Sequence, residues 1–426
     1  MSASRVVSVA CDAGDDMRPW LRAVREAGLR MLVVSRAAPD ARRDELERLA
    51  GATQRFDARE APRRFEADVD VDIGGGVERD LGGDIETDIT GCVLLATSGS
   101  TGTPRLVELA WPALEASARL GAKRIPFGAG DAWHGSLSPA HIGGLMIHAR
   151  ALVLGGEVRV APPPRAWSDL AGCTHCSLVA PQLARLLDDP ADPPATLRAA
   201  MLGGGPSASA LHDAAIARGV PLYSTYGMTE TASQVATGLR ARGDAATLAG
   251  APLEGIRVSI DAPSGEQGEI GEILVDGPTL ARAVHGDGAR HAVARPFRTR
   301  DTGFLDESGR LHVVGRLDAM FISGGRNIHP ESIERALLAV PGVRAACVVG
   351  VPHAKWGMRP VAFVDLADDR ATHSEASLRA ALAHELDAPL VPDAFLAMPA
   401  DEAARMKPSR AALAARLASH ERFPAL

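Results

Sequence analysis

A loop of small hydroxyl residues and glycines follows a short apolar run and ends in an arginine. The run Val93–Ala96 leads into Thr-Ser-Gly-Ser-Thr-Gly-Thr-Pro-Arg, residues 97–105. Glycines let backbone N–H groups approach an oxyanion closely, and the hydroxyls add further donors. The arginine brings a positive charge to an anion that the loop encloses. A Walker A loop is excluded because no Gly-Lys-Ser/Thr follows at the required spacing, and a flexible connector is the alternative for this loop taken alone.

A second group of chemically useful side chains lies in Tyr226-Gly-Met-Thr-Glu230, directly after the expected strand Leu222–Ser224. It offers an aromatic ring, a hydroxyl and a carboxylate within five residues. A carboxylate close to a phosphate-binding loop would repel the ligand unless a hard cation such as Mg²⁺ lies between them. The two segments together therefore indicate a site for a phosphate-bearing ligand and Mg²⁺.

A glycine cluster follows another expected strand. Ala199–Leu202 is apolar and leads into Gly203, Gly204, Gly205 and Pro206. In an open α/β sheet, the carboxyl ends of parallel strands form the crevice where ligands bind. The cluster is a candidate part of that crevice, and a tight turn is the alternative.

The elements that must position these segments alternate between strand and helix. We expect strands at Val6–Val9 and Arg30–Val34 and helices at Arg18–Ala27 and Asp40–Leu49. This alternation is typical of a parallel, doubly wound sheet. Further helices are expected at 111–120, 145–154 and 182–187, and a strand at 177–179. Residues 60–90 are acidic and glycine-rich, and we expect an exposed connection there.

Composition restricts the class of protein. A chain of 426 residues predicts two or three domains. The net charge of −7 argues against a nucleic-acid partner, and no apolar run reaches membrane-spanning length. Five scattered cysteines are typical of reduced thiols in a cytoplasm. Cys173 and Cys176 have metal-site spacing, but no second pair completes a site, so we expect them in the core.

The order of the motifs resembles the adenylate-forming superfamily of acyl-CoA synthetases, carrier-loading adenylation domains and luciferases. Two of its elements are the loop 97–105 and the segment 226–230 described above. Residues 268–275 resemble its Gly-Glu-Ile strand, and residues 297–303 resemble its ribose-binding segment. Residues 315–334 resemble its hinge, and residues 406–410 resemble the segment that holds its catalytic lysine. Within the superfamily, the chain most resembles o-succinylbenzoate–CoA ligases, on His141–Leu145, Ser177–Leu183, Gly315–Gly325 and Lys407–Arg410.

The resemblance implies an α/β fold with two domains. The large N-terminal domain, residues 1–317, would contain doubly wound α/β subdomains and a β-rich subdomain, and a small mobile α+β lid would follow at 318–426. The implied activity is that of an ATP- and Mg²⁺-dependent ligase, which activates a carboxylic acid as acyl-AMP and transfers it to coenzyme A. An enzyme that loads a carrier protein is one alternative, and a non-catalytic nucleotide-binding scaffold is another.

The resemblance also assigns roles to individual residues. Catalysis would use Lys407, Thr229 and Glu230, with Glu230 holding the metal. Asp318 would be the hinge, His141 and Gly144 would line the acid pocket, and Gly324 and Gly325 the coenzyme A channel. The ATP- and AMP-binding residues would be Thr97, Ser98, Gly99, Ser100, Thr101, Gly102, Arg105, Gly203, Gly204, Gly205, Pro206, Tyr226, Gly227, Asp301 and Arg316.

Three features depart from the family pattern. Arg105 stands where the family usually has lysine, and its bulk is expected to alter closure of the loop. Arg300 replaces a usual glycine before Asp301, so we expect a remodelled turn there. The N-terminus lacks a helical segment that helps cover the sheet in the family. Two outcomes are open: a looser N-terminal subdomain, or an apolar patch for a partner subunit, as in a homodimer.

Overall fold

The computed structural model shows the strand–helix alternation that the sequence predicts at the start of the chain. Both of the first two helices end at a glycine with positive φ, Gly28 at 64° and Gly51 at 67°, a common way to terminate a helix. The first strand pairs in parallel with the two that follow it. These elements are β1 (Val6–Cys11), α1 (Arg18–Ala27), β2 (Arg30–Ser35), α2 (Asp40–Ala50) and β3 (Ala52–Asp57).

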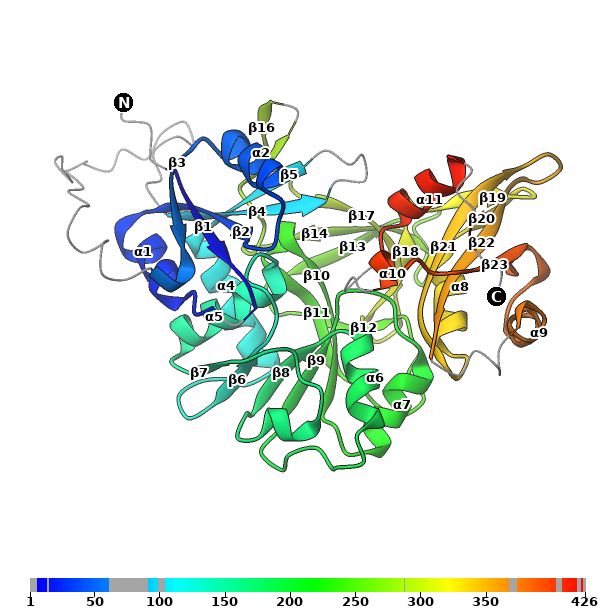
Figure 1. The fold of residues 1–426 in the computed structure, drawn as a ribbon, viewed down its shortest axis with the longest axis horizontal. Coiled ribbons are helices and arrows are strands. Elements are labelled where there is room, and N and C mark those ends of the chain that lie inside the picture. The colour runs from blue at the N-terminus through cyan, green and yellow to red at the C-terminus, as the bar shows by residue number, and fades with distance from the viewer. Residues whose placement is uncertain are drawn as a thin grey trace. The chain divides into compact units, whose positions relative to one another are not determined.

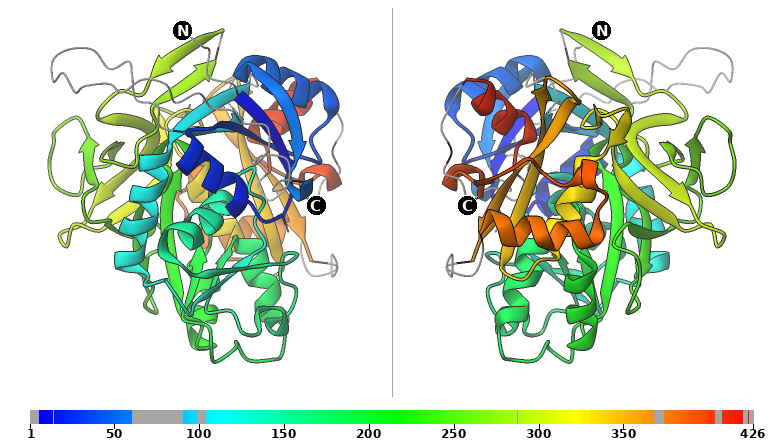
Figure 2. Two further views of the ribbon diagram at one scale, coloured as in Figure 1. Left: turned by 90° about the vertical axis from the view of Figure 1, so that its left-hand side faces the viewer. Right: turned by 90° about the vertical axis from the view of Figure 1, so that its right-hand side faces the viewer.

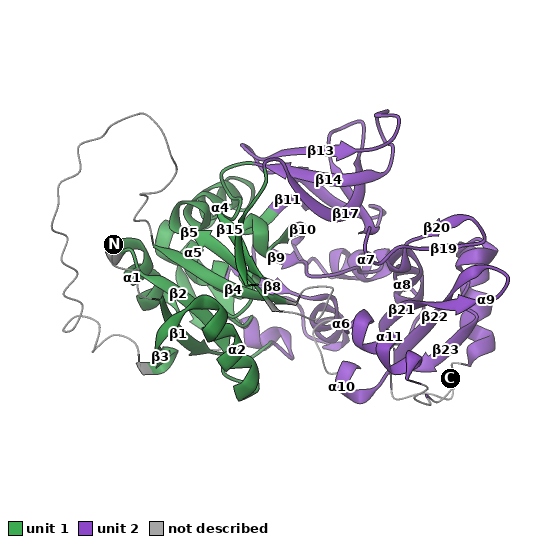
Figure 3. Cartoon of the chain, turned by 90° about the horizontal axis from the view of Figure 1, so that it is seen from above, with its two compact units in different colours: residues 1–163, 227–234, 277–294 green, residues 164–226, 235–276, 295–426 purple. Residues whose placement is uncertain are grey.

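The structure describes residues 6–13, 15–60, 91–98, 104–286, 288–367, 374–403, 408–419 and 423. The expected connection at 60–90 therefore lies almost wholly outside the described residues. The chain divides into two compact units (Figure 3). Unit 1 comprises residues 1–163, 227–234 and 277–294, and unit 2 comprises residues 164–226, 235–276 and 295–426.

The main sheet of unit 1 is parallel among β1, β2, β3 and β4, as the strand–helix alternation predicts, and it continues with antiparallel strands. Its strand order is β16-β15-β5-β4-β2-β1-β3, and β4 joins β2 in parallel. From β4 onward, β5, β15 and β16 pair in antiparallel fashion, because β4 and β5 form a hairpin on the two sides of the hydroxyl-rich loop. The bounds are β4 (Cys92–Ser98), β5 (Pro104–Ala110), β15 (Ala283–Gly286) and β16 (Ala289–Ala292).

Side chains of this sheet alternate between two buried faces, as the two-residue period of a strand requires. One face packs against α1, α4 and α5 through residues such as Val7, Met31 and Leu95. The opposite face packs against α2 through residues such as Val6, Leu32 and Leu94. Figure 1 shows α2 on the other side of the sheet from α4 (Trp111–Arg124) and α5 (Ile142–Leu154). Unit 1 also contains the parallel pair β6 (Ala132–Gly135) and β7 (Glu157–Val160).

Unit 2 begins with three parallel strands and continues with antiparallel ones. Its strand order is β13-β14-β17-β18-β12-β11-β10-β9-β8, in which β8, β9 and β10 are parallel. Two helices pack on the parallel strands around Trp167 and Leu202. The bounds are β8 (His175–Leu178), α6 (Ala180–Asp188), β9 (Ala199–Leu202), α7 (Ser209–Ala217), β10 (Leu222–Met228), β11 (Ser233–Leu239), β12 (Leu248–Pro252), β13 (Arg257–Asp261), β14 (Gly271–Asp276), β17 (Phe297–Leu305) and β18 (Leu311–Arg316).

The C-terminal part of unit 2 has a separate five-stranded sheet, with order β20-β19-β22-β21 and β23 paired to β22. Helices α8 and α9 cover one face of this sheet and α11 covers the other (Figure 2). The bounds are β19 (Phe321–Ser323), β20 (Arg326–Ile328), α8 (Pro330–Leu338), β21 (Val343–His353), β22 (Gly357–Leu366), α9 (Glu375–Glu385), β23 (Ala394–Ala397), α10 (Ala400–Ala403) and α11 (Arg410–Ala418).

The cysteines are core residues, as expected. All five are buried and none is in a disulfide, and Cys176 packs among the apolar residues beneath α6 and α7. Among the described residues, no group of three or more His, Cys, Asp or Glu side chains could hold a metal ion. A helix with the length and apolar character needed to cross a bilayer is also absent from the described part of the chain.

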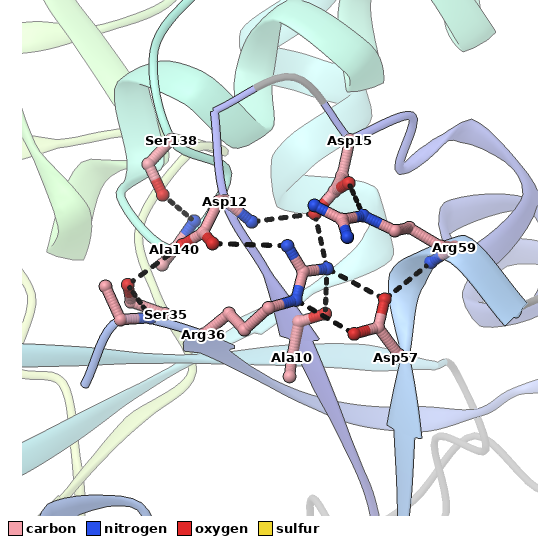
Figure 4. Close-up of polar contacts among 10 residues, drawn as sticks. Ala10, Asp12, Asp15, Ser35, Arg36, Asp57, Arg59, Ser138 and Ala140 are labelled. Carbon is pink, nitrogen blue, oxygen red and sulfur yellow. Dashed lines mark hydrogen bonds and ion pairs between the residues drawn. The ribbon is translucent and has the colours of Figure 1, made fainter. Parts of the chain in front are cut away.

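One arginine ties together the carboxyl ends of the first three strands (Figure 4). Arg36, which follows β2, donates to both carboxylate oxygens of Asp57 at 2.8 Å. It also donates to Asp15 at 2.8 Å and to Asp12 at 3.1 Å. Arg59 adds a second, longer contact to Asp15 at 3.3 Å. Because Asp15 is buried, removal of these partners would leave its carboxylate without a compensating contact.

We expect the substitution Arg36→Leu to lower the free energy of unfolding by about 2–3 kcal/mol, because it leaves the buried carboxylate of Asp15 without its main partner. Arg119→Leu is the matched control, since Arg119 pairs with Glu115 and both side chains are exposed, 59% and 36%. The control should change stability by less than about 1 kcal/mol. Urea denaturation measures both values, and equal effects would contradict the special role of Arg36.

Candidate active site

The chain passes from β10 to β11 through a tight reversal at residues 227–234, all of which belong to unit 1. A Cβ atom at Gly227 would lie 1.6 Å from the carbonyl oxygen of Ser233, so no other residue fits there. Ala232 and Ser233 have φ angles of 50° and 90°, a region that residues with a Cβ atom avoid. The reversal is therefore strained, and its shape must be maintained by its surroundings.

A buried hydroxyl holds the reversal from inside. Thr231 accepts a hydrogen bond from the backbone N–H of Met228 at 3.2 Å, and its Oγ1 lies 3.1 Å from the carbonyl oxygens of Met228 and Ser233. The preceding residues, Thr229 and Glu230, form the start of the short 3₁₀ helix η3 (Thr229–Thr231) and are half-buried. The reversal thus presents a hydroxyl and a carboxylate on an element whose conformation is closely defined.

Unit 1 holds this reversal and the two strands that flank the hydroxyl-rich loop, β4 and β5, in one packed body. Helix η3 packs against β5, and the backbone N–H of Ala281 donates to the carbonyl oxygen of Glu230 at 2.8 Å. The β4–β5 hairpin pairs Thr97 with Arg105, so these residues mark the two ends of the loop. Gly99, Ser100, Thr101 and Gly102 lie outside the described residues, and of Ser98 only the strand backbone is described.

Arg105 is exposed, and its aliphatic stem lies against β15. A Cβ atom at Gly286 would lie 3.2 Å from Cγ of Arg105, so the absence of a side chain at position 286 makes room for this stem. The substitution of lysine by arginine therefore keeps a cation at this place.

A chain of polar contacts in unit 2 joins the predicted ribose-binding carboxylate to the predicted hinge. The hydroxyl of Tyr226 donates to Oδ2 of Asp301 at 2.7 Å. Arg316 donates to Oδ1 of Asp301 at 3.1 Å, and the β17–β18 register places these two residues opposite each other. The same guanidinium donates from Nε and Nη2 to the two oxygens of Asp318, both at 2.8 Å.

The pKa shifts along this chain of contacts favour the ionised forms of Arg316 and Asp318. The hydrogen bonds from Arg316 lower the pKa of Asp318 below its ordinary value. Its bonds to Asp318 raise the pKa of Arg316, so the guanidinium stays charged. Burial and the neighbouring Asp301 raise the pKa of Tyr226, so its hydroxyl remains a donor. Asp301 is thereby held in one orientation by two donors.

Arg300, the residue before this carboxylate, has a φ of 64°. That is the left-handed backbone that a glycine would favour, and the side chain is exposed. Its N–H donates to Oε1 of Glu272 at 3.1 Å, and its carbonyl accepts from the N–H of Leu317 at 2.8 Å. The arginine therefore adopts a glycine-like conformation inside β17 instead of requiring a different turn.

The glycine cluster 203–206 follows β9 and lies against the neighbouring strand β10. A Cβ atom at Gly203 would lie 2.8 Å from Cγ2 of Thr225, the residue before Tyr226. Gly204 has a φ of 88°, which glycine adopts without strain. The structure thus brings the predicted adenine-binding segments, 203–206 and Tyr226, to adjacent strand ends.

A buried histidine fixes the residues that follow the cluster. Nδ1 of His212 lies 2.8 Å from Nη2 of Arg240, which can only donate, so Nδ1 accepts and Nε2 carries the proton. Nε2 then donates to Oγ of Ser207, 2.7 Å away. Burial, together with the positive charge of Arg240, lowers the pKa of His212 to about 4.

Gly324 and Gly325 form the two-residue turn of the β19–β20 hairpin. Both have positive φ, 57° and 80°, which is typical of the turns that suit the twist of a hairpin. The indole of Trp356, 44% exposed, lies beside this turn, 3.1 Å from the position of a Cβ atom at Gly324. The predicted channel residues therefore have a close steric neighbour that the sequence did not indicate.

His141 and Gly144 lie at the start of α5. His141 is the exposed N-cap residue, and its N–H donates to the carbonyl oxygen of Ser138 at 3.0 Å. A Cβ atom at Gly144 would lie 2.2 Å from that same oxygen. The requirement for glycine at this position therefore has a packing explanation, independent of any role in an acid pocket.

Lys407 lies outside the described residues, but the segments on both sides of it are anchored. Before it, Glu402 accepts from the N–H of Ser409 at 2.6 Å. After it, Arg410 pairs with Glu331 at 3.1 Å and with Glu334 at 2.6 Å. Ser409 and Arg410, which follow position 407, are thus held to α10 and α8.

The described donor set fits a magnesium ion only as part of a complex with phosphate. Glu230 supplies one carboxylate, and no cluster of three possible metal ligands exists among the described residues. Mg²⁺ is usually bound through one or two protein carboxylates, several waters and the phosphates of a substrate. Glu230 and Thr229 are sufficient for that mode.

We expect Arg300→Gly to change the free energy of unfolding by less than about 1 kcal/mol. Relief of the left-handed strain would be offset by the greater freedom of glycine in the unfolded chain. Arg300→Val should destabilise by about 1–2 kcal/mol, because a β-branched residue tolerates this φ poorly. Urea denaturation of both variants tests the assignment, and a valine variant as stable as the parent would refute it.

Stability should fall as the pH falls from about 6.5 to 4, in part through His212. The unfolded chain binds a proton near the ordinary value of 6.5, whereas the folded chain binds it only near 4, so acid favours unfolding in this window. The slope should be at most about 1.4 kcal/mol per pH unit. His212→Gln should flatten the measured pH dependence of stability, and an unchanged slope would contradict the buried neutral imidazole.

Residues 7–284 match the family described as AMP-binding enzyme, and residues 332–405 match its C-terminal domain. A 2-succinylbenzoate–CoA ligase from Geobacillus kaustophilus is 36% identical over 306 residues, 67% of this chain but only 61% of that protein. The corresponding ligase from Bacillus cereus is 34% identical over 325 residues, 73% of this chain and 67% of that protein.

Solved structures of similar proteins support the same family. The o-succinylbenzoate CoA synthetase MenE from Bacillus subtilis, in complex with the acyl-adenylate intermediate OSB-AMP, has a TM-score of 0.76 at 25% identity. The match covers 92% of this chain and 84% of that one. A variant of E. coli MenE with bound OSB-AMS has a TM-score of 0.75 at 26% identity, covering 98% and 88% of the two chains. The chain therefore belongs to the AMP-binding enzyme family, the adenylate-forming superfamily that its motifs resemble.

Proposed function

We propose that this protein is an ATP-dependent acid–CoA ligase and that its acid is 2-succinylbenzoate or a close aryl analogue. The observation that carries the proposal is the Thr229–Glu230 reversal, packed in one body with the hairpin that bears the hydroxyl-rich loop. The relatives named 2-succinylbenzoate–CoA ligase support the choice of acid. Acyl-AMP and pyrophosphate would form first, and the thiol of coenzyme A would then displace AMP.

The first half-reaction brings a carboxylate to the α-phosphate of ATP, so two anions must meet. Catalysis then depends mostly on positioning and on neutralising charge. Glu230 would hold Mg²⁺ and Thr229 would bind the α-phosphate, while residues 97–102 and Arg105 would bind the other phosphates. The metal would supply charge neutralisation at the phosphates.

The nucleoside would be held by unit 2. Asp301, oriented by Tyr226 and Arg316, has the oxygens needed to accept hydrogen bonds from two vicinal ribose hydroxyls. Residues 203–206 and the ring of Tyr226 would form the adenine slot. His141 and Gly144 would line the acid pocket.

Lys407 would bridge the incoming carboxylate and the α-phosphate. Lysine is rare here: only three of the 46 basic Lys and Arg residues are lysines. A compact ammonium at position 407 in a chain that otherwise uses arginine favours a role that the larger, planar guanidinium would not fill.

The second half-reaction requires Lys407 to withdraw and the thiol to enter. We propose that residues 318–426 form a lid that turns about Asp318 and brings Gly324 and Gly325 to the coenzyme A channel. The bidentate contact between Arg316 and Asp318 supports this, because it ties the pivot to the residue that also orients Asp301.

The proposed function is tested by pyrophosphate release from Mg²⁺-ATP with a panel of aryl, succinylbenzoyl and aliphatic acids, with and without coenzyme A. We expect release with 2-succinylbenzoate and formation of its thioester only when coenzyme A is present. Pyrophosphate release without a thioester would indicate that the acceptor is a carrier protein and not coenzyme A. ATP binding without release for any acid would favour a non-catalytic scaffold.

Lys407→Ala should reduce acyl-AMP formation by a factor of about 100 or more, because a charge at the reacting atoms is lost. The same variant should still convert preformed acyl-AMP and coenzyme A to the thioester at a rate close to that of the parent. Lys123→Ala is the matched control among the three lysines, because Lys123 is an exposed residue at the end of α4. Adenylation by the Lys407 variant at the parental rate would contradict the assignment.

A further inference from the structure

One arginine of the C-terminal sheet uses its whole guanidinium on contacts around the β19–β20 hairpin. Arg359 lies on β22, and its side chain is only 13% exposed. It donates five hydrogen bonds, as many as a guanidinium has N–H donors. Because no donor of Arg359 is left for a substrate, its role lies in the segments that it joins.

The five hydrogen bonds join two separate segments of the chain. Nη1 donates to Oγ of Ser323 on β19 at 3.3 Å and to the carbonyl oxygen of Pro389 at 2.7 Å. Nη2 donates to the carbonyl oxygen of Val391 at 3.0 Å. Nε and Nη2 both donate to Oδ1 of Asp393, at 2.9 and 2.7 Å. The arginine thus ties the end of β19 to the connection between α9 and β23.

The turn that follows Ser323 has little support of its own. Its two residues, Gly324 and Gly325, have positive φ and the large conformational freedom of glycine. The strands on its two sides are each three residues long, and a hairpin is marginally stable at best in isolation. It joins the sheet where Ser323 pairs with Gly357 and where the N–H of Gly324 donates to the carbonyl oxygen of Trp356 at 2.9 Å. The shape of the turn therefore depends on how Ser323 is held.

Ser323 is 1% exposed, so its hydroxyl needs a partner within the protein, and Arg359 supplies it. A methionine at position 359 would fill much of the same space but would leave this hydroxyl and the carbonyl oxygens of Pro389 and Val391 without their donor. A lysine would restore only part of the contacts, because an ammonium has three donors and lacks the planar fork of the guanidinium.

We propose that Arg359 is a positioning residue for the thioester-forming half-reaction. Through Ser323 it holds the Gly324–Gly325 turn in the shape needed to admit the thiol of coenzyme A. Arg359 contacts no reacting group itself. The inference rests on the proposed function for its catalytic readout, whereas the conformation of the hairpin is measured without any substrate.

The catalytic test compares Arg359→Met, Arg359→Lys and Ser323→Ala with the parent in the two half-reactions. Misplacing reacting groups by about 1 Å can cost a factor of 100, so Arg359→Met should slow thioester formation from supplied 2-succinylbenzoyl-AMP at least about 10-fold and raise the KM for coenzyme A. Adenylation, measured as pyrophosphate release, should stay within about twofold of the parent. Ser323→Ala should show the same split more weakly, and Arg359→Lys should recover part of the loss.

Arg379→Met is the matched control. Arg379 lies on α9 and donates to the carbonyl oxygens of Pro392 and Asp393 at 2.6 and 2.9 Å, so it holds the same connection, but it has no hydrogen bond to the described residues of β19 or β20. Its loss should lower the melting temperature and affect the two half-reactions equally. A folded Arg359→Met enzyme that forms the thioester at the parental rate would overturn the inference. Equal losses in both half-reactions would also overturn it, because Arg359 would then only stabilise the fold.

Trp356 provides a readout that needs neither acid nor coenzyme A. It is 44% exposed, whereas the other four tryptophans are at most 6% exposed, so acrylamide quenches the fluorescence of Trp356 preferentially. Its indole lies beside the turn, 3.1 Å from the position of a Cβ atom at Gly324, so a loosened turn should expose it further. Arg359→Met should therefore be quenched more strongly than the parent and Arg379→Met, and Trp356→Phe should abolish the difference.

The two readouts separate failure of this inference from failure of the proposed function. If the parent activates none of the acids but Arg359→Met shows stronger quenching, the proposed function fails while the role of Arg359 in holding the hairpin is supported. Quenching of equal strength in the parent and Arg359→Met would refute that role, whatever the protein catalyses.

Discussion

No side chain fits at position 227, and this constraint determines how the chain presents its most reactive segment. The carbonyl oxygen of Ser233 occupies the place of a Cβ atom there, so β10 and β11 can be joined only by a very close backbone reversal. Closing the reversal forces Ala232 and Ser233 into left-handed conformations. Unit 1 stabilises the result with Thr231 and Ser117, both of which are buried. A threonine and a glutamate are thereby presented on a rigid element, which electrostatic catalysis requires.

Arginine serves as the connecting cation in both units. Arg36 binds three aspartates at the ends of parallel strands, Arg316 binds the two carboxylates at positions 301 and 318, and Arg410 binds two glutamates of α8. A planar guanidinium with five donors can join two carboxylates in a fixed geometry, which an ammonium does less well. In unit 2 this property links Asp301 to Asp318, the residues proposed above to bind the ribose and to act as the hinge.

Local signals predicted much of the fold. The helix Arg18–Ala27 and the strand Ala199–Leu202 have the predicted bounds, because glycine punctuation and short apolar runs determine them within a few residues. The strand Pro104–Ala110 was not predicted, and the sheet is mixed because of it. The pairing of this strand with β4 depends on a hairpin, whereas the glycines and hydroxyl residues before it predicted only a loop that ends at Arg105. The family motifs similarly predicted that Tyr226 and Asp301 share a site, but not that Arg316 bridges Asp301 to Asp318. Arg359 escaped notice because its contacts join segments that lie 30 to 36 residues away in the sequence, which no local pattern reveals.

The central claim is that this chain converts an acid and ATP to an acyl adenylate, and the adenylate itself can be measured. Purified protein, Mg²⁺-ATP and 2-succinylbenzoate would be incubated without coenzyme A, and the bound products identified by mass spectrometry. The account predicts 2-succinylbenzoyl-AMP in an amount close to that of the enzyme, and its conversion to the thioester when coenzyme A is added. Protein that binds ATP but yields no adenylate with 2-succinylbenzoate or any other acid of the panel would contradict it.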